Sequence, residues 1–318
     1  MIDPIEAALG FFFQAKHVEC CRVFHGRGQL FQGLEHVCLD WYAPVLLITA
    51  YKSNIDIDAF LTVIDKADLH SQITSILLQK RYEEGAPVEI LKGTVPDKIL
   101  ALEDGLVFEV RLGKQQNSGL FLDMRPLRSW VKANCDGRNV LNLFAYTCSF
   151  SVAALAGGAN SVTNVDMSKT SMRWGLENHA HNRQDVSLVN QIPYNVFTSW
   201  GRIKQLGRYD LVIIDPPTRQ RRSFDAEKNY GSVIKRMTKL CNDRADIIAT
   251  LNSPFLDQQF LLDKFSKNAP AAEFVESIPA AEEFEDKYPE KALKILRFKY
   301  RERRRETESR IKRTKENL

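Results

Sequence analysis

Short apolar runs in the second half of the chain alternate with turns and helical patterns, and this alternation limits the possible folds most. Ser168 can cap a helix, and the apolar segment 150–156 ends at a glycine pair, which is typical of a helix terminus. The runs that resemble strands are residues 140–144, 162–165, 209–214 and 247–251. Strands that alternate with helices require crossover connections, so we predict an α/β fold with a doubly wound, mostly parallel sheet.

The first hundred residues have a different pattern, which predicts a smaller N-terminal α/β domain. Apolar residues at three- and four-residue spacing predict helical packing over residues 60–64 and again over residues 73–80. Strands are predicted over residues 18–24, 36–40, 44–51, 88–91 and 106–112. A length of 318 residues also favours two domains. We therefore divide the chain into residues 1–112, residues 113–300 and a charged tail, residues 301–318.

The tail accounts for the net charge of the whole chain. The sequence has 44 Lys and Arg against 40 Asp and Glu, and residues 301–318 hold eight of the basic and four of the acidic residues. Contact with RNA phosphates is one interpretation, because basic side chains release counterions from nucleic acid. A solvated helix with internal Glu–Arg pairs is the other.

Signals for membrane insertion or export are missing from the sequence. No apolar run approaches the roughly 20 residues that a membrane-spanning helix needs. The N-terminus has acidic residues where an export signal carries basic ones, and the six cysteines form no CxxC pair. We therefore expect a cytoplasmic protein with reduced thiols and no membrane partner.

The turn at residues 145–149 follows the first parallel strand, where open α/β sheets bind nucleotides. It contains neither GxGxxG nor GxxxxGK, which argues against nicotinamide dinucleotides and against a P-loop. Asp166 closes the next strand, where such sheets place an acid that accepts hydrogen bonds from the ribose hydroxyls. The alternative is that Asp166 helps to cap the helix that starts near Ser168.

Asp215, Pro216 and Pro217 directly follow the apolar run 209–214. Two prolines stiffen the chain and donate no backbone N–H, so carbonyl oxygens at this edge stay free to accept hydrogen bonds. An aspartate beside such carbonyls can hold an amino group. A plain Pro-Pro turn is the alternative, but the position after a buried strand favours a site.

In this order, the segments resemble S-adenosylmethionine-dependent methyltransferases with the class I (Rossmann-like) fold, and more narrowly the bacterial large-subunit (23S) rRNA methyltransferase family. The resemblance rests on SGLFLDMR at 118–125, VLNLFAYTCSFSVAALAGGA at 140–159, NVDMSKT at 164–170, YDLVIIDPPT at 209–218 and Leu251-Asn252-Ser253. The upstream stretch RVFHGRGQLFQGL is similar to the small domain that precedes the catalytic domain in that family. The resemblance implies S-adenosylmethionine as cofactor, large-subunit rRNA as partner, no obligatory metal, and an RNA-binding role for residues 1–112.

The resemblance also implies roles for single residues. Asp215, Pro216 and Pro217 would line the place where the methyl group meets the substrate base. The implied cofactor-binding residues are Phe144, Ala145, Tyr146, Thr147, Asp166, Ser168, Asn195 and Asp215. Asn195 stands where the family usually has an acid near the adenine. Two larger departures are Cys148-Ser149 in place of Gly-Gly and Asn117 in place of Lys; the added Cβ atoms could narrow the cofactor loop or be absorbed by a small shift.

Basic residues near the expected site suit a substrate that carries phosphate. The predicted substrate-binding residues are Arg125, Arg128, Arg219, Arg221 and Arg222. The alternative is a solvated surface loop. Phe224 or Tyr230 could stack on an extruded base, although packing in the core is favoured for both. Histidines and cysteines also cluster between His17 and Cys38, but their spacing matches no zinc pattern, so we expect a packed strand there.

The expected activity is methylation of an rRNA base. A nitrogen acceptor is favoured, because methylation of pyrimidine carbon-5 usually needs a thiolate and no cysteine follows Asp215-Pro216-Pro217. The family includes carbon-5 enzymes, so this choice stays open. Two other functions remain: a catalytically idle RNA-binding module that kept the fold, and, less favoured, a nicotinamide-dependent oxidoreductase.

Overall fold

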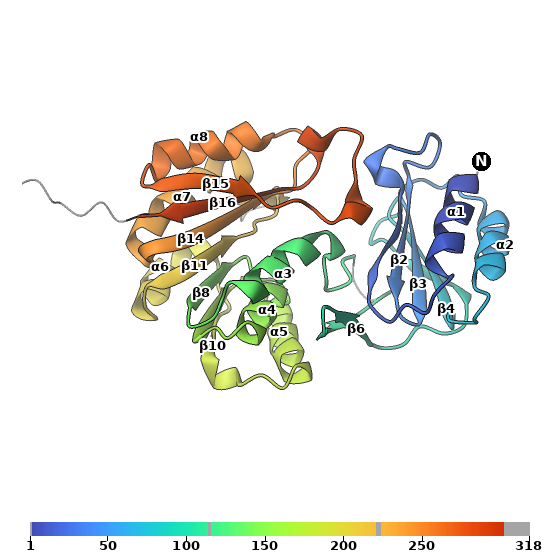
Figure 1. The fold of residues 1–318 in the computed structure, drawn as a ribbon, viewed down its shortest axis with the longest axis horizontal. Coiled ribbons are helices and arrows are strands. Elements are labelled where there is room, and N and C mark those ends of the chain that lie inside the picture. Colours follow the sequence, from blue (N-terminus) through green and yellow to red (C-terminus); the bar gives the residue numbers. More distant parts are fainter. Residues whose placement is uncertain (1, 114–115, 221–223, 302–318) are drawn as a thin grey trace, which may run out of the picture.

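The computed structural model describes residues 2–113, 116–220 and 224–301. The predicted tail beyond Arg301 and the predicted site residues Arg221 and Arg222 lie outside these described residues. Two units lie side by side in Figure 1: a smaller unit (residues 2–92) and a larger unit (residues 99–301).

The larger unit is built on a seven-stranded sheet with the order β10-β9-β8-β11-β14-β16-β15. Its strands are β8 (Asn139–Leu143), β9 (Ser161–Val165), β10 (Val189–Ile192), β11 (Tyr209–Ile214), β14 (Cys241–Leu251), β15 (Ala272–Ser277) and β16 (Lys294–Tyr300). The first five strands in this order pair in parallel, and β16 is antiparallel to both of its neighbours. The prediction of a mostly parallel sheet is therefore confirmed.

Helices cover both faces of this sheet (Figure 1). One face carries α3 (Arg125–Ala133), α4 (Ser149–Ala156) and α5 (Lys169–His181), and the other carries α6 (Val196–Gln205), α7 (Ala226–Leu240) and α8 (Gln258–Asn268). As predicted, Ser168 caps α5: its hydroxyl accepts a hydrogen bond from the Ser171 N–H at 3.1 Å. Because the central strands β8 and β11 are buried between two helical layers, they are apolar along most of their length.

The smaller unit has a five-stranded sheet whose strands lie in chain order. They are β1 (Cys21–His25), β2 (Val37–Tyr42), β3 (Val45–Ala50), β4 (Ser75–Lys80) and β5 (Val88–Lys92). Only β3 and β4 pair in parallel within this sheet. The helices α1 (Asp3–Phe12) and α2 (Ile57–Ala67) pack on the same face of the sheet, away from the larger unit (Figure 1).

The prediction of helical packing over residues 73–80 is wrong, because residues 75–80 form β4. This strand lies between β3 and β5, and Ile76, Leu77 and Leu78 are all completely buried. In a strand buried on both faces, apolar residues occur at nearly every position. A helical spacing can be picked out of such a run, so periodicity alone could not distinguish the two structures.

A two-stranded hairpin, β6 (Ile99–Glu103) and β7 (Leu106–Val110), joins the two units. It packs against α5: the Trp174 Nε1 donates a hydrogen bond to the Glu109 carbonyl oxygen at 3.0 Å. The predicted domain boundary near residue 112 lies after this hairpin. The hairpin itself packs against α5, which belongs to the larger unit.

The remaining short elements are η1 (Gly26–Gly28), η2 (Leu122–Met124), η3 (Val186–Leu188), β12 (Arg219–Gln220), β13 (Phe224–Asp225), η4 (Glu282–Phe284) and η5 (Pro289–Lys291). Within the described ranges, none of the helices is long and apolar enough to cross a membrane.

Candidate functional site

The register of the parallel strands brings the predicted site residues to one edge of the sheet. Leu143 of β8 pairs with Val165 of β9 on one side and with Ile214 of β11 on the other. The residues that follow, among them Asp166 and Asp215, therefore leave the sheet at the same level. They border a cavity of about 680 Å³, which we call the sheet-edge cavity. Its volume is in the range of small-molecule sites.

Most of the predicted cofactor and catalytic residues line this cavity. They are Phe144, Ala145, Tyr146, Asp166, Ser168, Asn195, Asp215, Pro216 and Pro217. Thr147 does not: its side chain is buried, and its hydroxyl donates a hydrogen bond to the Gly119 carbonyl oxygen. The structure thus gives Thr147 the role of holding the loop against the segment around Gly119, in place of the predicted cofactor contact.

The loop after β8 has an unusual backbone. Phe144, Tyr146 and Cys148 have φ values of 61°, 48° and 64°, in the left-handed region that favours glycine. The Tyr146 N–H donates a hydrogen bond to Asp166 Oδ2 at 3.0 Å, which ties the loop to the end of β9. A non-glycine residue in the left-handed conformation lowers the stability of the folded state. Such residues persist where the surrounding structure fixes them, often at binding sites.

Cys148 and Ser149 replace the family's glycine pair. Of the two, Cys148 does not narrow the sheet-edge cavity. The Cys148 side chain is completely buried on the other side of the loop, where it packs with Ala145 and Met172. Ser149 begins α4 and lines the cavity. The extra side chain at residue 148 is therefore accommodated against α5.

Asp166 borders the sheet-edge cavity and accepts two backbone hydrogen bonds there. Its Oδ1 accepts a hydrogen bond from the Ser168 N–H at 2.8 Å, and its Oδ2 accepts the one from Tyr146. A carboxylate has about four acceptor positions, so each oxygen keeps capacity for a ligand hydroxyl. Burial raises the pKa of Asp166, while the two backbone N–H groups act in the opposite direction. The helix cap itself is Ser168.

Asp215 stands at the end of β11 and borders the same cavity. Burial raises the pKa of Asp215 to about 6; the nearby Asp123 carboxylate acts in the same direction, and a hydrogen bond from the Thr250 hydroxyl opposes the rise. A carboxylate with a pKa near 6 is mostly ionised at neutral pH. It is also more basic than an ordinary carboxylate, so it accepts hydrogen bonds more strongly.

Phe224 and Tyr230 are core residues, which excludes the base-stacking role. Tyr230 is completely buried, and its hydroxyl donates towards the carbonyl oxygens of Ile214 and Thr250. Phe224 is almost completely buried and packs near Phe144. Their packing fixes β11 and β14 behind Asp215.

The predicted cluster of phosphate-binding arginines is not supported at Arg128 and Arg125. Arg128 lines the sheet-edge cavity, but its guanidinium is buried and pairs through two nitrogens with Glu103, at 2.5 and 2.6 Å. Arg125 pairs with Glu19 and Asp104, which links α3 to the hairpin and to the smaller unit. Arg219 begins the short strand β12. The charges of Arg125 and Arg128 are thus neutralised within the protein.

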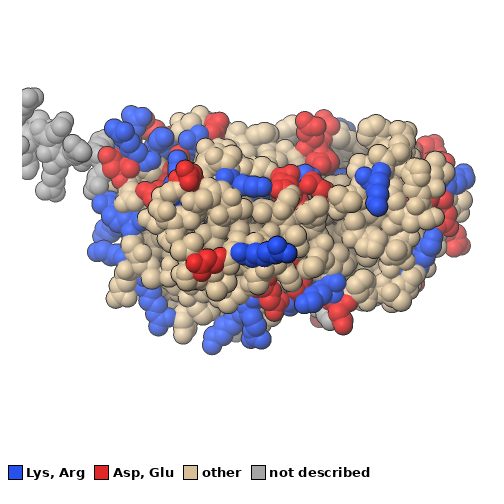
Figure 2. Space-filling view, turned by 60° about the horizontal axis from the view of Figure 1, so that its bottom comes forward, with Lys and Arg blue, Asp and Glu red and all other residues tan. Residues whose placement is uncertain are grey.

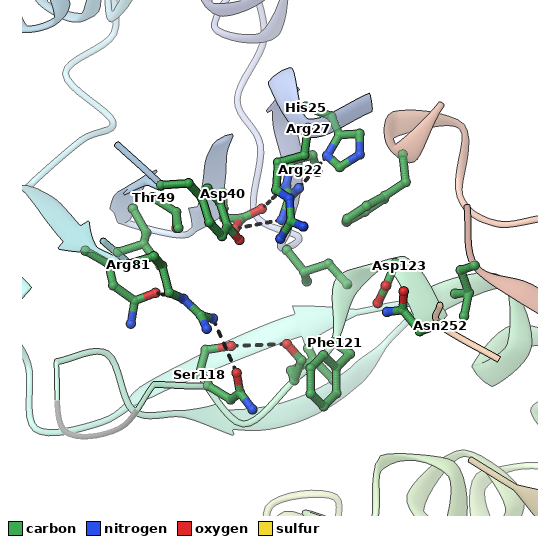
Figure 3. Close-up of a pocket in the computed structure, with 18 of the residues that line it drawn as sticks. Arg22, His25, Arg27, Asp40, Thr49, Arg81, Ser118, Phe121, Asp123 and Asn252 are labelled. Carbon is green, nitrogen blue, oxygen red and sulfur yellow. Dashed lines mark hydrogen bonds and ion pairs between the residues drawn. The ribbon is translucent and has the colours of Figure 1, made fainter. Parts of the chain in front are cut away.

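Three residues of the segments that carry the resemblance line the site, although no site role was predicted for them. Phe121, Asp123 and Asn252 line the sheet-edge cavity and also a second cavity between the two units (Figure 3). Burial raises the pKa of Asp123, against the charges of Arg22 and Arg128. The sequence held a signal for Asn252, since it is a polar residue directly after a buried strand, as Asp166 and Asp215 are.

The histidines and cysteines of the smaller unit form no metal site among the described residues. Cys20 and Cys38 are buried in the core, as predicted for a packed strand. His25 Nδ1 lies 2.6 Å from an Arg22 nitrogen, and burial together with this neighbouring charge lowers the pKa of His25 to about 3.

The residues of the sheet-edge cavity suit an adenosyl cofactor. Asp166 offers acceptor positions at the end of β9, and apolar Phe144, Phe150 and Val196 supply surface for a nucleoside. This fit rests on donors, acceptors and volume that the chain itself provides.

Comparisons with known proteins agree with this geometry. The model of the S-adenosylmethionine-dependent methyltransferase family matches residues 21–299. YwbD of Bacillus subtilis, a proposed ribosomal RNA large subunit methyltransferase, is 32% identical over 256 residues, which cover 76% of this chain and 63% of that protein. Ribosomal RNA large subunit methyltransferase K/L of Shewanella pealeana is 38% identical over 232 residues, covering 68% of this chain and 32% of the relative. The alignments thus cover less than two thirds of either relative.

Solved structures show the same fold. SMU.776, a proposed methyltransferase crystallised with SAH, superimposes with a TM-score of 0.80 at 24% identity, covering 94% of this chain and 81% of the other. The tRNA m1G37 methyltransferase of M. jannaschii gives a TM-score of 0.59 at 14% identity, with 83% and 74% covered. With the family model matched over nearly the whole described chain, this protein belongs to the S-adenosylmethionine-dependent methyltransferase family.

Proposed function

We propose that this chain methylates a base of RNA, with large-subunit ribosomal RNA as the substrate. Two relatives named as large-subunit rRNA methyltransferases support this choice of substrate. The observation that carries it is the position of Asp215 and Pro216 on the wall of the sheet-edge cavity, close to the residues shared with the second cavity. A base that enters from the second cavity can thereby meet the cofactor at Asp215. Such a substrate also places the protein in the cytoplasm.

The residues of this chain orient the reactants. Bound S-adenosylmethionine supplies an electrophilic methyl group on a sulfonium. Asp166 would accept hydrogen bonds from the cofactor's ribose hydroxyls, and the loop from Phe144 to Tyr146 would lie against its methionine part. The ionised Asp215 and the Pro216 carbonyl oxygen accept hydrogen bonds from the amino group or ring N–H of the base. Holding the nucleophile at contact distance in a site without water provides most of the rate enhancement for such a displacement.

We propose a nitrogen atom as the methyl acceptor. None of the six cysteines, all within the described ranges, lines the sheet-edge cavity. Cys148, the nearest in sequence, is buried on the far side of the loop, and burial raises its pKa. Carbon-5 methylation usually needs a thiolate that attacks the ring, and no cysteine lines this cavity.

The other functions considered receive less support. The idle RNA-binding module was considered because Cys148-Ser149 replaces a glycine pair; of these two residues, only Ser149 lines the sheet-edge cavity. The nicotinamide-dependent oxidoreductase is excluded by membership of the methyltransferase family.

Transfer of a labelled methyl group tests the proposal. Large-subunit rRNA from a strain lacking the gene is incubated with the full chain and S-adenosylmethionine labelled in the methyl group. We expect label in a methylated nitrogen of one nucleotide, none with Asp215→Ala, and full labelling with the exposed control Asp263→Asn. Calorimetric titration with S-adenosylmethionine, and with NADH as control, checks that each variant still binds its cofactor. Cofactor binding without transfer to any rRNA would contradict the proposal, and label at carbon-5 would contradict the choice of acceptor.

A further inference from the structure

The second cavity lies between the two units and has a volume of about 400 Å³; we call it the inter-unit cavity (Figure 3). Strands of the smaller unit supply one wall, with Arg22, Asp40 and Arg81. Residues 116–123 supply much of the opposite wall. Neither unit forms this cavity alone, so its shape depends on the way the units pack.

Among the described residues, two arginines of this cavity form no ion pair, in contrast to their neighbours. Arg22 forms an ion pair with Asp40, and Arg111 forms ion pairs with Glu109 and Glu177. Arg27 instead stacks over the Tyr51 ring at 4.4 Å, and no ion pair of Arg27 or Arg81 occurs among the residues that the structure describes.

The side chain of Arg81 is oriented by neutral groups. Its Nε donates a hydrogen bond to Gln79 Oε1 at 3.0 Å, and another nitrogen donates to Asn117 Oδ1 at 3.3 Å. Asn117 stands where the family usually has Lys. The positive charge beside residue 117 is therefore that of Arg81. A guanidinium held by amides remains available to an anion, and its planar fork matches phosphate.

The inter-unit cavity and the sheet-edge cavity share a wall. Asn117, Phe121, Asp123 and Asn252 border both. The Phe121 side chain is 44% exposed, and its ring lies 5.6 Å from that of Tyr146. Exposed aromatic rings beside a basic pocket are how proteins commonly stack single-stranded RNA bases.

In the part of the chain that the structure describes, the face of the protein drawn in Figure 2 carries no broad basic surface to which RNA could bind. Lys and Arg are interspersed there with Asp and Glu over most of the face. On this face, recognition of phosphate would therefore depend on individual cations at defined positions.

We propose that the inter-unit cavity binds the target nucleotide of single-stranded RNA, with its flanking phosphates on Arg27 and Arg81 and its base passing Phe121 towards Asp215. This inference rests on the proposed function and names the site by which the same substrate enters. Extrusion of the base from its stack is required, because chemistry on a base needs access to its edge. The smaller unit thus contributes the phosphate ligands and the larger unit contributes the chemistry.

The experiment uses the full chain with Arg27→Gln, Arg81→Gln and the double variant. The matched control is Arg202→Gln, because Arg202 is an exposed arginine of α6 that stacks over the Tyr194 ring at the same 4.4 Å. KM and kcat are measured on unmethylated large-subunit rRNA, and the binding of a labelled fragment of this rRNA is followed by fluorescence anisotropy against salt concentration. Calorimetry gives the affinity for S-adenosylmethionine.

We expect each single variant to raise KM for rRNA about tenfold, with kcat and cofactor affinity unchanged. Loss of one phosphate contact lowers the slope of log K against log salt by about 0.7 for single strands. Phe121→Leu is expected to weaken RNA binding without changing this slope, because stacking involves no counterion. Arg202→Gln is expected to leave all these values unchanged.

The outcomes separate this inference from the proposed function. If wild-type protein methylates rRNA and the Arg27 and Arg81 variants keep its KM and salt slope, the inter-unit cavity is not the entry site, while the proposed function stands. If wild-type protein neither binds nor methylates rRNA, the proposed function itself is overturned. An equal loss in Arg202→Gln would show that only overall charge matters and would also contradict the inference.

Discussion

The sulfur of Cys148 fills the space that a side chain at residue 175 would need. A Cβ built on Gly175 of α5 would lie 2.4 Å from the Cys148 Sγ and 2.8 Å from its Cβ. Cys148 itself has a φ of 64°, so the chain places a non-glycine residue in a left-handed conformation and a glycine within a helix. The two positions compensate each other: the side chain absent from residue 175 leaves room for the one at residue 148.

We predict that Gly175→Ala destabilises the protein by about 1–3 kcal/mol, through overpacking against Cys148. In the double variant Cys148→Gly, Gly175→Ala, the closest remaining contact of the new Cβ is 3.4 Å from the Thr147 carbonyl carbon, an ordinary distance. The double variant should therefore regain most of the lost stability, which urea denaturation of the four proteins in the cycle measures. Gly201→Ala is the control, because a Cβ there meets nothing within 4 Å, and it should be stabilising. Additive effects of Cys148→Gly and Gly175→Ala would contradict this coupling.

Asp166 is predicted to determine the affinity for S-adenosylmethionine. Asp166→Asn keeps one oxygen that can accept a backbone hydrogen bond but removes acceptor positions and charge, so we expect binding at least about tenfold weaker. Isothermal titration calorimetry provides the measurement. Asp185→Asn is the matched control, because Asp185 also accepts a backbone hydrogen bond, from Ser187, at an exposed position outside the sheet-edge cavity. Unchanged affinity in a folded Asp166→Asn variant would falsify the assignment.

Asp215 is predicted to make both activity and stability depend on pH. Because burial raises its pKa from 3.8 to about 6, the folded state keeps the proton to higher pH than the unfolded state does. Its contribution to the free energy of unfolding therefore falls as the pH rises from about 4 to about 6, by up to roughly 3 kcal/mol. Asp215→Asn has no such charge to bury.

Denaturation at two pH values checks this relation. Asp215→Asn should be more stable than the wild type at about pH 7.5 and no more stable near pH 4, where the wild-type carboxyl is neutral. Methylation by the wild type should increase with an apparent pKa near 6, as the carboxylate that accepts the hydrogen bond forms, and the variant should be inactive throughout. A wild type that stays the more stable protein at pH 7.5 would exclude a costly buried charge.

Arg128 and Glu103 form a structural pair, and we predict that it can be replaced without loss of RNA affinity. Arg128→Met leaves the Glu103 carboxylate buried without its partner and should cost about 3–5 kcal/mol. The double variant Arg128→Met, Glu103→Leu removes both charges and should recover most of this. Urea denaturation and RNA binding are measured on the double variant, which avoids a single variant that fails to fold. Weakened RNA binding in a stable double variant would restore the substrate role predicted from the sequence.

The sequence by itself determined the fold class and the end of the sheet that carries the site. Apolar runs followed by polar residues placed Asp166 and Asp215 at strand ends, and parallel pairing brings such ends to one edge. Alternation of strands with helices predicted the crossovers. The positions of strands, helices and strand ends depend on residues that are close in sequence, so they can be predicted from local sequence patterns.

The tertiary structure alone decided which side chains face a ligand. Arg128 appeared available in the sequence and is neutralised by Glu103, 25 positions away. Residues 75–80 became a strand because β3 and β5 enclose them on both sides. Cys148 turns away from the sheet-edge cavity because Gly175, on a different helix, leaves space for it. Direction, burial and charge compensation depend on partners distant in the chain, and only packing brings those partners together.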